Sequence, residues 1–151
     1  MKTIYYLEDD SAYAQLVVAK LEREFPLFRR RCEIHRVSTV KGYLELLGEF
    51  KQNRKAKPDL IMLDLMVRYA DPEPGDPEVP TEWSYESAGL RCAALTLTEF
   101  PAIPIVLYSI VEDADISNDP EYLNLRDKIK YVAKGPNLNN LAKEIYALLG
   151  E

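Results

Sequence analysis

The sequence predicts a doubly wound α/β domain, in which helices cover both faces of a parallel β-sheet. Short and nearly continuous apolar runs recur along the chain, as expected of strands that are buried on both faces. Segments with apolar residues at helical spacing lie between these runs. The chain has 151 residues, of which 47% are hydrophobic and 29% are charged, and this fits a single globular domain over residues 1–151.

Five strands are predicted. Four of them are clear apolar runs, at residues 4–7, 60–63, 105–108 and 131–133. The other, from Cys32 to Val37, alternates less cleanly between apolar and polar residues, so we expect it at an edge of the sheet. Each parallel connection needs a crossover, usually a helix, and right-handed crossovers leave few possible topologies.

Five helices are predicted between and after these strands. Four show apolar residues at helical spacing: Tyr13, Leu16, Val17 and Leu21; Val40, Tyr43, Leu44 and Leu47; Leu90, Ala93, Ala94 and Leu97; and Leu138, Leu141, Ile145, Leu148 and Leu149. The remaining helix, fourth in the chain, lies between Asp119 and Lys128 and is short. Asp119 is its expected N-cap, with Pro120 in the first turn.

An acidic, proline-rich insertion is predicted at about residues 67–87. Its prolines and acids are Pro72, Pro74, Pro77, Pro80, Asp71, Glu73, Asp76, Glu78 and Glu82. A long loop of this kind is uncommon inside a compact domain and is usually functional or mobile. We expect it to overhang the carboxyl ends of the strands.

Composition excludes several classes of function. The formal net charge of −6 argues against nucleic acid as the principal ligand, and no apolar stretch is long enough to span a bilayer. The amino terminus does not resemble a secretory leader, so a cytosolic protein is expected. Cys32 and Cys92 have no zinc-binding or redox spacing and are interpreted as buried thiols. The absence of a glycine-rich phosphate loop excludes the common nucleotide-binding domains.

One local cluster of positive charge contrasts with the acidic composition. It consists of Arg29, Arg30, Arg31 and Arg36. No aromatic stacking set or recognition helix accompanies it, so we interpret it as a solvated strand edge.

Polar residues follow four of the predicted strands. They are Glu8, Asp9 and Asp10 after the first strand, Asp64 after the third, Ser109 after the fourth and Lys134 after the fifth. The carboxyl ends of parallel strands meet at one edge of the sheet, where ligands of such folds bind. Carboxylates gathered there repel one another unless a hard cation lies among them, and this donor set suits Mg²⁺. The sequence therefore predicts a magnesium site.

The same residues suit phosphoryl transfer. A carboxylate such as Asp64 can act as a nucleophile toward phosphorus, while Lys134 and Ser109 stabilise the phosphoryl oxygens. Each residue alone has an ordinary interpretation: a loop cap, a loop hydroxyl or a solvated lysine. Their joint occurrence at successive strand ends is much less expected by chance.

Four motifs resemble the receiver domain of two-component response regulators, over essentially the whole chain. They are Ile4-Tyr5-Tyr6-Leu7-Glu8-Asp9-Asp10, Pro58-Asp59-Leu60-Ile61-Met62-Leu63-Asp64-Leu65-Met66, Pro104-Ile105-Val106-Leu107-Tyr108-Ser109 and Tyr131-Val132-Ala133-Lys134. The resemblance implies a flavodoxin-like sheet of strand order 2-1-3-4-5 with five helices.

The resemblance also implies roles for the acidic residues. Asp64 would be the phosphoacceptor, Asp9 a direct Mg²⁺ ligand, Glu8 a ligand through water and the Met66 backbone carbonyl a further ligand. Asp10 is then expected to cap the following helix.

Three further residues match the family's phosphoryl-binding and switch positions. Lys134 would pair with the phosphoryl group, and Ser109 would be the switch hydroxyl that moves toward it. Tyr131 matches an aromatic whose rotamer accompanies activation, although a plain strand-edge aromatic is an equal alternative.

Three features depart from the family pattern. The insertion separates Asp64 from the matching Gly89, where the family usually has a short loop. Gly135 precedes Pro136, whereas proline commonly follows the lysine directly, so the position of Lys134 could be shifted. Ile110 is larger than the small residue usual after the switch hydroxyl, and we hypothesise that it slows phosphoryl turnover.

The resemblance implies a signalling module and not a dedicated enzyme, since it would assist only its own phosphorylation and dephosphorylation. Its expected partners are a histidine kinase or histidine phosphotransfer protein and a downstream protein target, with no nucleic acid or membrane. With nothing beyond Glu151, output should pass through the fourth helix, fifth strand and last helix. We expect the protein to be a monomer or to form a weak homodimer through this face.

The main alternative is a pseudo-receiver, a protein-interaction module that works without phosphorylation. A haloacid-dehalogenase-type phosphatase would need a second aspartate two residues after Asp64, and that position is Met66. His35 lies in a strand-like run, so it is interpreted as a surface histidine and not as a phosphorylated one.

Overall fold

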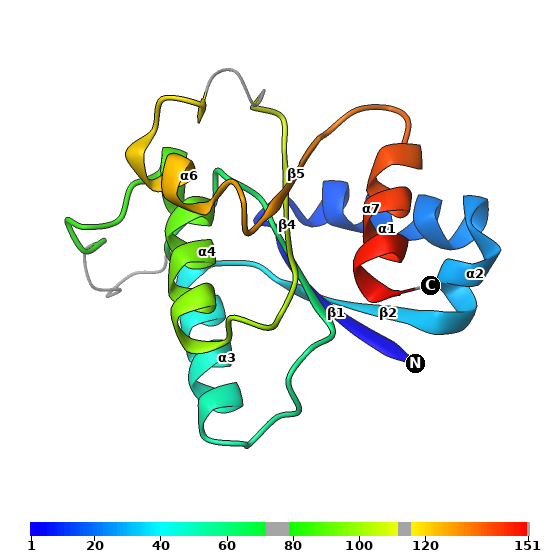
Figure 1. Cartoon of the computed structure of the whole chain (residues 1–151), viewed down its shortest axis with the longest axis horizontal. Helices are drawn as coiled ribbons and strands as arrows, with labels where there is room; N and C mark the ends of the chain where they lie inside the picture. Colours follow the sequence, from blue (N-terminus) through cyan, green and yellow to red (C-terminus); the bar gives the residue numbers. More distant parts are fainter. Residues whose placement is uncertain (72–78, 112–115, 151) are drawn as a thin grey trace.

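The computed structural model describes residues 1–71, 79–111 and 116–150, and its centre is a five-stranded parallel sheet of order β2-β1-β3-β4-β5 (Figure 1). The strands are β1 (Lys2–Leu7), β2 (Cys32–Val37), β3 (Leu60–Leu63), β4 (Ile105–Ser109) and β5 (Lys130–Ala133). The predicted fold class and strand order are therefore confirmed.

The helices form one layer on each face of the sheet (Figure 1). One layer contains α3 (Val40–Lys51), α4 (Ala88–Glu99) and α6 (Pro120–Leu125). The other contains α1 (Ser11–Glu24), α2 (Pro26–Arg31) and α7 (Asn139–Leu149). A short 3-10 turn, η1 (Tyr85–Ser87), precedes α4.

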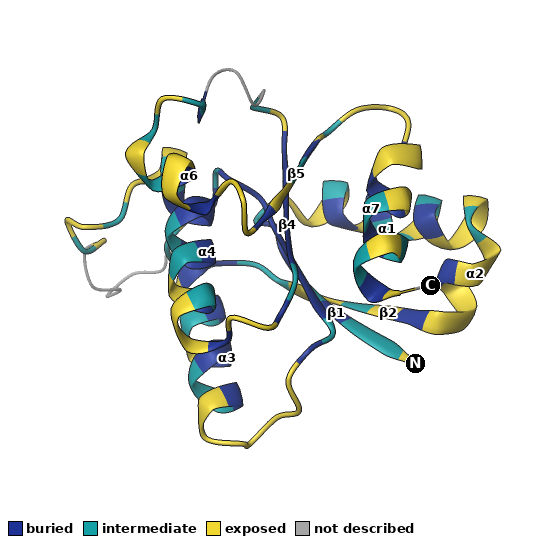
Figure 2. Cartoon of the chain, viewed as in Figure 1, coloured by how far each residue is buried: buried dark blue, intermediate teal, exposed yellow. Residues whose placement is uncertain are grey.

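Burial follows the pattern that the apolar runs predicted. Every residue of β3 and β4 is buried, because helices cover both faces of these central strands (Figure 2). The edge strand β2 is mostly half-exposed or exposed, in agreement with its weaker apolar pattern. Cys32 and Cys92 are both buried and not joined in a disulfide, as expected.

The predicted helices are all present, and their caps agree with the sequence. Asp119 Oδ1 accepts hydrogen bonds from the backbone N–H groups of Glu121 and Tyr122 at the start of α6. Asp10 Oδ1 accepts one from the N–H of Tyr13 at the start of α1. Leu16 differs from expectation, because its side chain lies on the exposed side of α1 and is 55% exposed.

Helix α2 was not predicted, and it corrects the interpretation of the arginine cluster. Arg29, Arg30 and Arg31 lie in the last turn of α2 and not on a strand edge. Only Arg36 lies on β2, where its guanidinium group donates hydrogen bonds to the carbonyls of Glu8 and Asp9. Pro26 at the first turn starts α2, and Phe28 anchors it in the core.

Part of the predicted 67–87 insertion, residues 72–78, lies outside the described residues. The described ends of the segment pack on the domain. Val67 is buried, and the Trp83 ring lies 5.9 Å from Tyr69 and 5.2 Å from the Arg91 guanidinium carbon. These contacts bring the segment back to the sheet edge at α4.

Gly89 allows the chain to pass close to the turn after β3, where α4 begins. A Cβ atom at Gly89 would lie 2.0 Å from the carbonyl oxygen of Asp64, so only glycine allows α4 to begin against the turn after β3. The Gly89 N–H donates to the carbonyl of Leu65 at 2.8 Å. In the described part of the chain, no helix is long and apolar enough to cross a membrane.

Candidate functional site

Three carboxylates converge at the carboxyl edge of the sheet. Glu8 and Asp9 follow β1, and Asp64 follows the neighbouring strand β3, whose Leu63 pairs with Leu7. One oxygen from each carboxylate lies within 4.8 Å of the others. Glu8 is 1% exposed and Asp64 is 6% exposed, so both are withdrawn from solvent. The structure thus brings together the acidic residues that the sequence selected.

Lys134 reaches this cluster from the end of β5. Its Nζ donates hydrogen bonds to Asp64 Oδ2 at 3.0 Å and to Glu8 Oε1 at 2.5 Å. Its backbone N–H donates to the carbonyl of Ser109 at 2.8 Å, which extends the pairing of β4 with β5. The glycine after Lys134 therefore does not displace the side chain from the carboxylates.

The electrostatics of this pair follow from burial and proximity. Burial raises the pKa of Glu8, and the negative charge of Asp64 acts in the same direction, against the hydrogen bond from Lys134. Burial alone would lower the pKa of Lys134. The hydrogen bond to Glu8 and the charges of Asp64 and Glu8 outweigh it, so this pKa is raised and the ammonium form is kept.

Two arginines hold the turn that carries Asp9. The Arg36 guanidinium group donates to the carbonyl of Glu8 at 2.8 Å and to that of Asp9 at 3.0 Å. Arg68, which follows β3, donates from its backbone N–H to Asp9 Oδ2 at 3.0 Å. These contacts join residues far apart in the chain, so no local sequence pattern indicates them.

The remaining residues that the sequence predicted for the site lie around the carboxylate cluster or further from it. Asp10 caps α1, as expected. Ser109 is fully buried at the end of β4, and its Oγ accepts a hydrogen bond from the N–H of Val111 at 3.3 Å. Tyr131 is half-buried on β5 and packs against the layer that contains α3, α4 and α6.

Three tyrosines also contact the cluster, and their sequence positions did not mark them as site residues. The Tyr6 hydroxyl donates to Glu8 Oε1 at 3.3 Å, and burial raises the pKa of Tyr6 above its usual value. Lys134 Nζ lies 4.4 Å from the centroid of the Tyr13 ring and 5.9 Å from that of Tyr108. These tyrosines come from β1, α1 and β4, so only the fold brings them together.

The cluster opens into a hollow of about 220 Å³. Its lining comprises Glu8, Asp9, Asp10, Tyr13, Asp64, Met66, Tyr85, Ile110 and Lys134. Ile110 is 66% exposed at the mouth. Tyr85 comes from the insertion, and burial together with the charges of Asp9 and Asp64 raises its pKa. The insertion therefore contributes directly to the walls of the site.

The donor set fits a magnesium ion. Asp64 Oδ1 is buried and has no hydrogen-bond partner among the residues that the structure describes. A buried carboxylate oxygen without a partner is costly, and a cation or a covalent substituent would satisfy it. Oxygen ligands that leave room for water are those that Mg²⁺ prefers.

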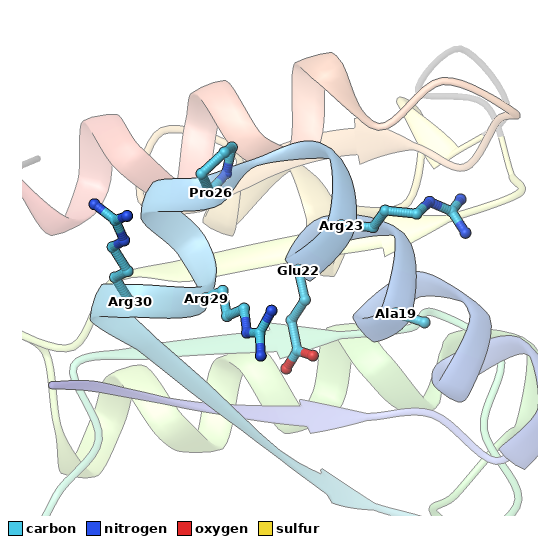
Figure 3. Close-up of a pocket in the computed structure, with 6 residues that line it drawn as sticks. All are labelled: Ala19, Glu22, Arg23, Pro26, Arg29 and Arg30. Carbon is cyan, nitrogen blue, oxygen red and sulfur yellow. The ribbon is translucent and has the colours of Figure 1, made fainter.

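A larger hollow, of about 740 Å³, lies between α1 and α2 and is lined by Ala19, Glu22, Arg23, Pro26, Arg29 and Arg30 (Figure 3). It is near the start of β2, at the opposite edge of the sheet from Asp64. Arg29 points toward Glu22, whereas Arg23 and Arg30 point away from each other (Figure 3). No convergent set of reactive groups forms there.

The sequence and the structure were compared with those of known proteins, and only solved structures match. No protein-family model matches the sequence, and no curated protein matches it at a significant level. Among solved structures, the response regulator TrrA from Thermotoga maritima, in complex with Mg²⁺-BeF, is 19% identical. The match covers 98% of this chain and 99% of that chain, with a TM-score of 0.66.

Two further solved structures of receiver domains are similar to this chain over nearly its whole length. A CheY-like response regulator receiver domain from Methanospirillum hungatei JF-1 is 18% identical, with a TM-score of 0.65 over 99% of this chain and 94% of that chain. The BeF3-activated DrrB receiver domain is 16% identical, with a TM-score of 0.63 over 100% and 99%. The chain therefore has the fold of response regulator receiver domains.

Proposed function

We propose that this protein is a phosphoaspartate-accepting receiver in two-component phosphorelay signalling, with Asp64 as the phosphoacceptor. The observation that carries the proposal is the position of Asp64. Its Oδ2 accepts a hydrogen bond from Lys134, and its buried Oδ1 lacks a partner among the described residues. The Asp64 carboxylate lies with those of Glu8 and Asp9. Asp64 Oδ2 is thus held by Lys134, and Oδ1 is available to bind a cation or to accept a phosphoryl group.

In the proposed reaction, Asp64 accepts a phosphoryl group from a phosphohistidine. A bond forms between a carboxylate oxygen of Asp64 and phosphorus, and the bond between phosphorus and the histidine nitrogen breaks. The electron pair of the broken bond stays on the imidazole. Lys134 and Ser109 stabilise the phosphoryl oxygens. Movement of Ser109 and Tyr131 then couples phosphorylation to a conformational change at the protein surface.

Mg²⁺, when bound, neutralises the phosphoryl oxygens as charge redistributes. Asp9 would hold the ion directly, Glu8 through water, and Asp64 and the Met66 carbonyl would complete the protein ligands. Arg36 and Arg68 hold the turn of Asp9 in place through the hydrogen bonds described above. Their role is to keep the ligand positioned before the ion arrives.

The surfaces around the site support a protein as phosphodonor. Leu16 and Ile110, both largely exposed, line one apolar hollow beside Lys134. Exposed apolar residues that gather next to a reactive group are typical of a contact surface. We infer that a histidine kinase or histidine phosphotransfer protein docks here, and that a downstream protein binds the face of α6, β5 and α7.

The proposal does not include a dedicated enzymatic activity, a nucleic-acid ligand or a membrane. We infer a cytoplasmic location, because the two cysteines are buried and not joined in a disulfide, as is common in a reducing compartment. A monomer, or a weak homodimer through the α6, β5 and α7 face, is consistent with output through protein contacts.

The direct test is phosphoryl transfer. A histidine phosphotransfer protein labelled on its phosphohistidine is mixed with this protein and Mg²⁺, and the label should move to a bond that hydroxylamine cleaves, as expected of an acyl phosphate. The Asp64→Asn variant should accept none. Label that persists in Asp64→Asn would contradict the assignment of the phosphoacceptor.

The second candidate is a pseudo-receiver that binds partners without phosphorylation. It is favoured by one observation: Tyr85, from the insertion, and Ile110 line the same acidic hollow as Asp64. A titration with Mg²⁺ and beryllofluoride separates the two functions. Binding that depends on Asp64 supports the receiver, and the absence of binding in both the parent and Asp64→Asn supports the pseudo-receiver.

A further inference from the structure

The ammonium group of Lys134 rests against tyrosine rings as well as carboxylates. Its Nζ lies 4.4 Å from the centroid of the Tyr13 ring, from α1, and 5.9 Å from that of Tyr108, from β4. It also donates hydrogen bonds to Glu8 and Asp64. The Lys134 ammonium group therefore contacts two carboxylates and lies near the faces of two aromatic rings.

The ring of Tyr13 offers the ammonium a contact of a different kind. A lysine ammonium within about 6 Å of a ring centroid is attracted by the electron-rich face, more strongly when water is excluded. The Lys134 side chain is only 8% exposed, so this contact is largely desolvated. The attraction holds the charge in place and leaves the N–H groups available for oxygen acceptors.

A hydrogen bond fixes the orientation of this ring. The hydroxyl groups of Tyr13 and Tyr108 lie 3.0 Å apart, with ring planes 29° from parallel. Tyr108 is 1% exposed and packs beside Tyr6, whose hydroxyl donates to Glu8. The half-buried Tyr13 is thus tied to a fully buried partner, which limits rotation of its ring.

We infer that Tyr13, locked by Tyr108, is a positioning residue that aims the Lys134 ammonium at the phosphoryl-binding side of Asp64. The inference rests on the proposed function and deepens it. Glu8 is also an expected metal ligand, so its hydrogen bond to Lys134 competes with that role. The cation–π contact with the Tyr13 ring also holds the Lys134 ammonium group in place, and it does not occupy a carboxylate oxygen.

The contact itself can be tested without any ligand. Protons above the face of an aromatic ring are shifted upfield in NMR spectra. The ε-methylene protons of Lys134 should therefore show an upfield shift that Tyr13→Phe retains and Tyr13→Leu removes. Resonances of Lys134 at ordinary lysine positions in the parent protein would overturn the inference, whatever the variants do.

The functional consequence is measured as the affinity for beryllofluoride at saturating Mg²⁺, alongside the affinity for Mg²⁺ alone. Loss of a cation–π contact weakens binding by roughly 2- to 30-fold. Tyr13→Leu should weaken beryllofluoride binding within this range and leave Mg²⁺ affinity nearly unchanged. Tyr13→Phe and Tyr108→Phe both remove the hydroxyl contact and keep both rings, so the beryllofluoride affinity of each should lie between those of the parent and Tyr13→Leu.

The matched control is Tyr146→Leu, which removes a half-buried tyrosine that packs on Phe28 away from Lys134. It should change neither affinity. Equal beryllofluoride affinity in Tyr13→Leu and the parent would overturn the positioning role. If the parent itself binds no beryllofluoride, the proposed function fails, and the NMR shift still decides whether Tyr13 orients Lys134. If Tyr13→Leu does not fold, the NMR shift in the parent decides the ring contact, and the two phenylalanine variants decide whether the hydroxyl contact matters: unchanged beryllofluoride affinity in both would overturn the locking by Tyr108.

Discussion

Strand β3 is flanked by two aspartates that lie at opposite edges of the sheet. Asp59 precedes the strand, its side chain is 40% exposed, and its Oδ2 accepts a hydrogen bond from the N–H of Thr3 at 2.8 Å. Asp64 follows the strand, is 6% exposed, and shares its surroundings with Glu8 and Lys134. The same residue type thus serves local structure at one end and forms a reactive cluster at the other.

The arginines at the amino edge extend this comparison. Arg29 and Arg30 are as close in sequence as Glu8 and Asp9, yet both are exposed and neither forms an ion pair with another residue in the described ranges. A cluster of charge in the sequence therefore does not make a site. Burial and convergence from several strands distinguish the carboxyl edge.

The largest difference between the two edges should appear when a charge is removed. Lys134→Met leaves Glu8 and Asp64 buried without their cation, so the free energy of unfolding should fall by about 3 kcal/mol without Mg²⁺. Arg30→Met at the amino edge should change it by less than about 0.5 kcal/mol. Urea unfolding of both variants measures the difference, and equal effects would remove the distinction between the edges.

A smaller effect is expected from backbone crowding beside Asp64. Gly89→Ala would place a Cβ atom 2.0 Å from the Asp64 carbonyl oxygen, so the backbone must shift. We expect a loss of about 1–3 kcal/mol in unfolding free energy. The control is Gly48→Ala in α3, where a Cβ meets nothing within 4 Å and alanine should stabilise the helix by about 0.5–1 kcal/mol. A neutral Gly89→Ala would contradict the tight approach of α4.

Much of this edge follows from the sequence. The apolar runs predict the strands, and strand ends predict that Glu8, Asp64 and Lys134 meet, because parallel strands end at one edge. Helix α2 could not be predicted in this way, since six residues are too short to show periodicity. Its three consecutive arginines suggested a solvated segment instead.

The supporting residues of the site were missed for a different reason. Tyr13 and Tyr108 lie far apart in the sequence and look like ordinary core positions, and Arg36 belonged to the arginine cluster. Tyr85 lies in a segment without periodicity, so nothing in the sequence placed it over Asp64. Contacts between side chains of distant elements depend on packing geometry, which the apolar pattern alone does not specify.

Within the acidic turn, neighbouring aspartates should separate into structural and binding roles. Asp10→Ala removes the N-cap of α1, so the unfolding free energy should fall by about 1 kcal/mol while Mg²⁺ affinity is kept. Asp9→Ala should instead abolish Mg²⁺ binding. Calorimetric titration with Mg²⁺ checks both variants. Loss of Mg²⁺ binding in Asp10→Ala would show that the cap is also part of the metal site.

The smallest effect on stability is expected at the mouth of the site. Ile110 is 66% exposed, so Ile110→Ala should leave stability within about 0.5 kcal/mol of the parent. On the hypothesis that the Ile110 side chain slows phosphoryl turnover, we expect the variant to shorten the half-life of the phosphorylated form. Leu123→Ala on α6, another exposed apolar residue, is the control. Identical half-lives in the parent and Ile110→Ala would rule out the hypothesis.

A comparison of the two aspartates of β3 shows whether the proposed phosphoryl site depends on Asp64. Beryllofluoride is titrated with Mg²⁺ into the parent protein, Asp64→Asn and Asp59→Asn, and binding is followed by calorimetry. We predict saturable, Mg²⁺-dependent binding in the parent and in Asp59→Asn, and none in Asp64→Asn. Binding that survives in Asp64→Asn, or that is absent from the parent, would contradict it.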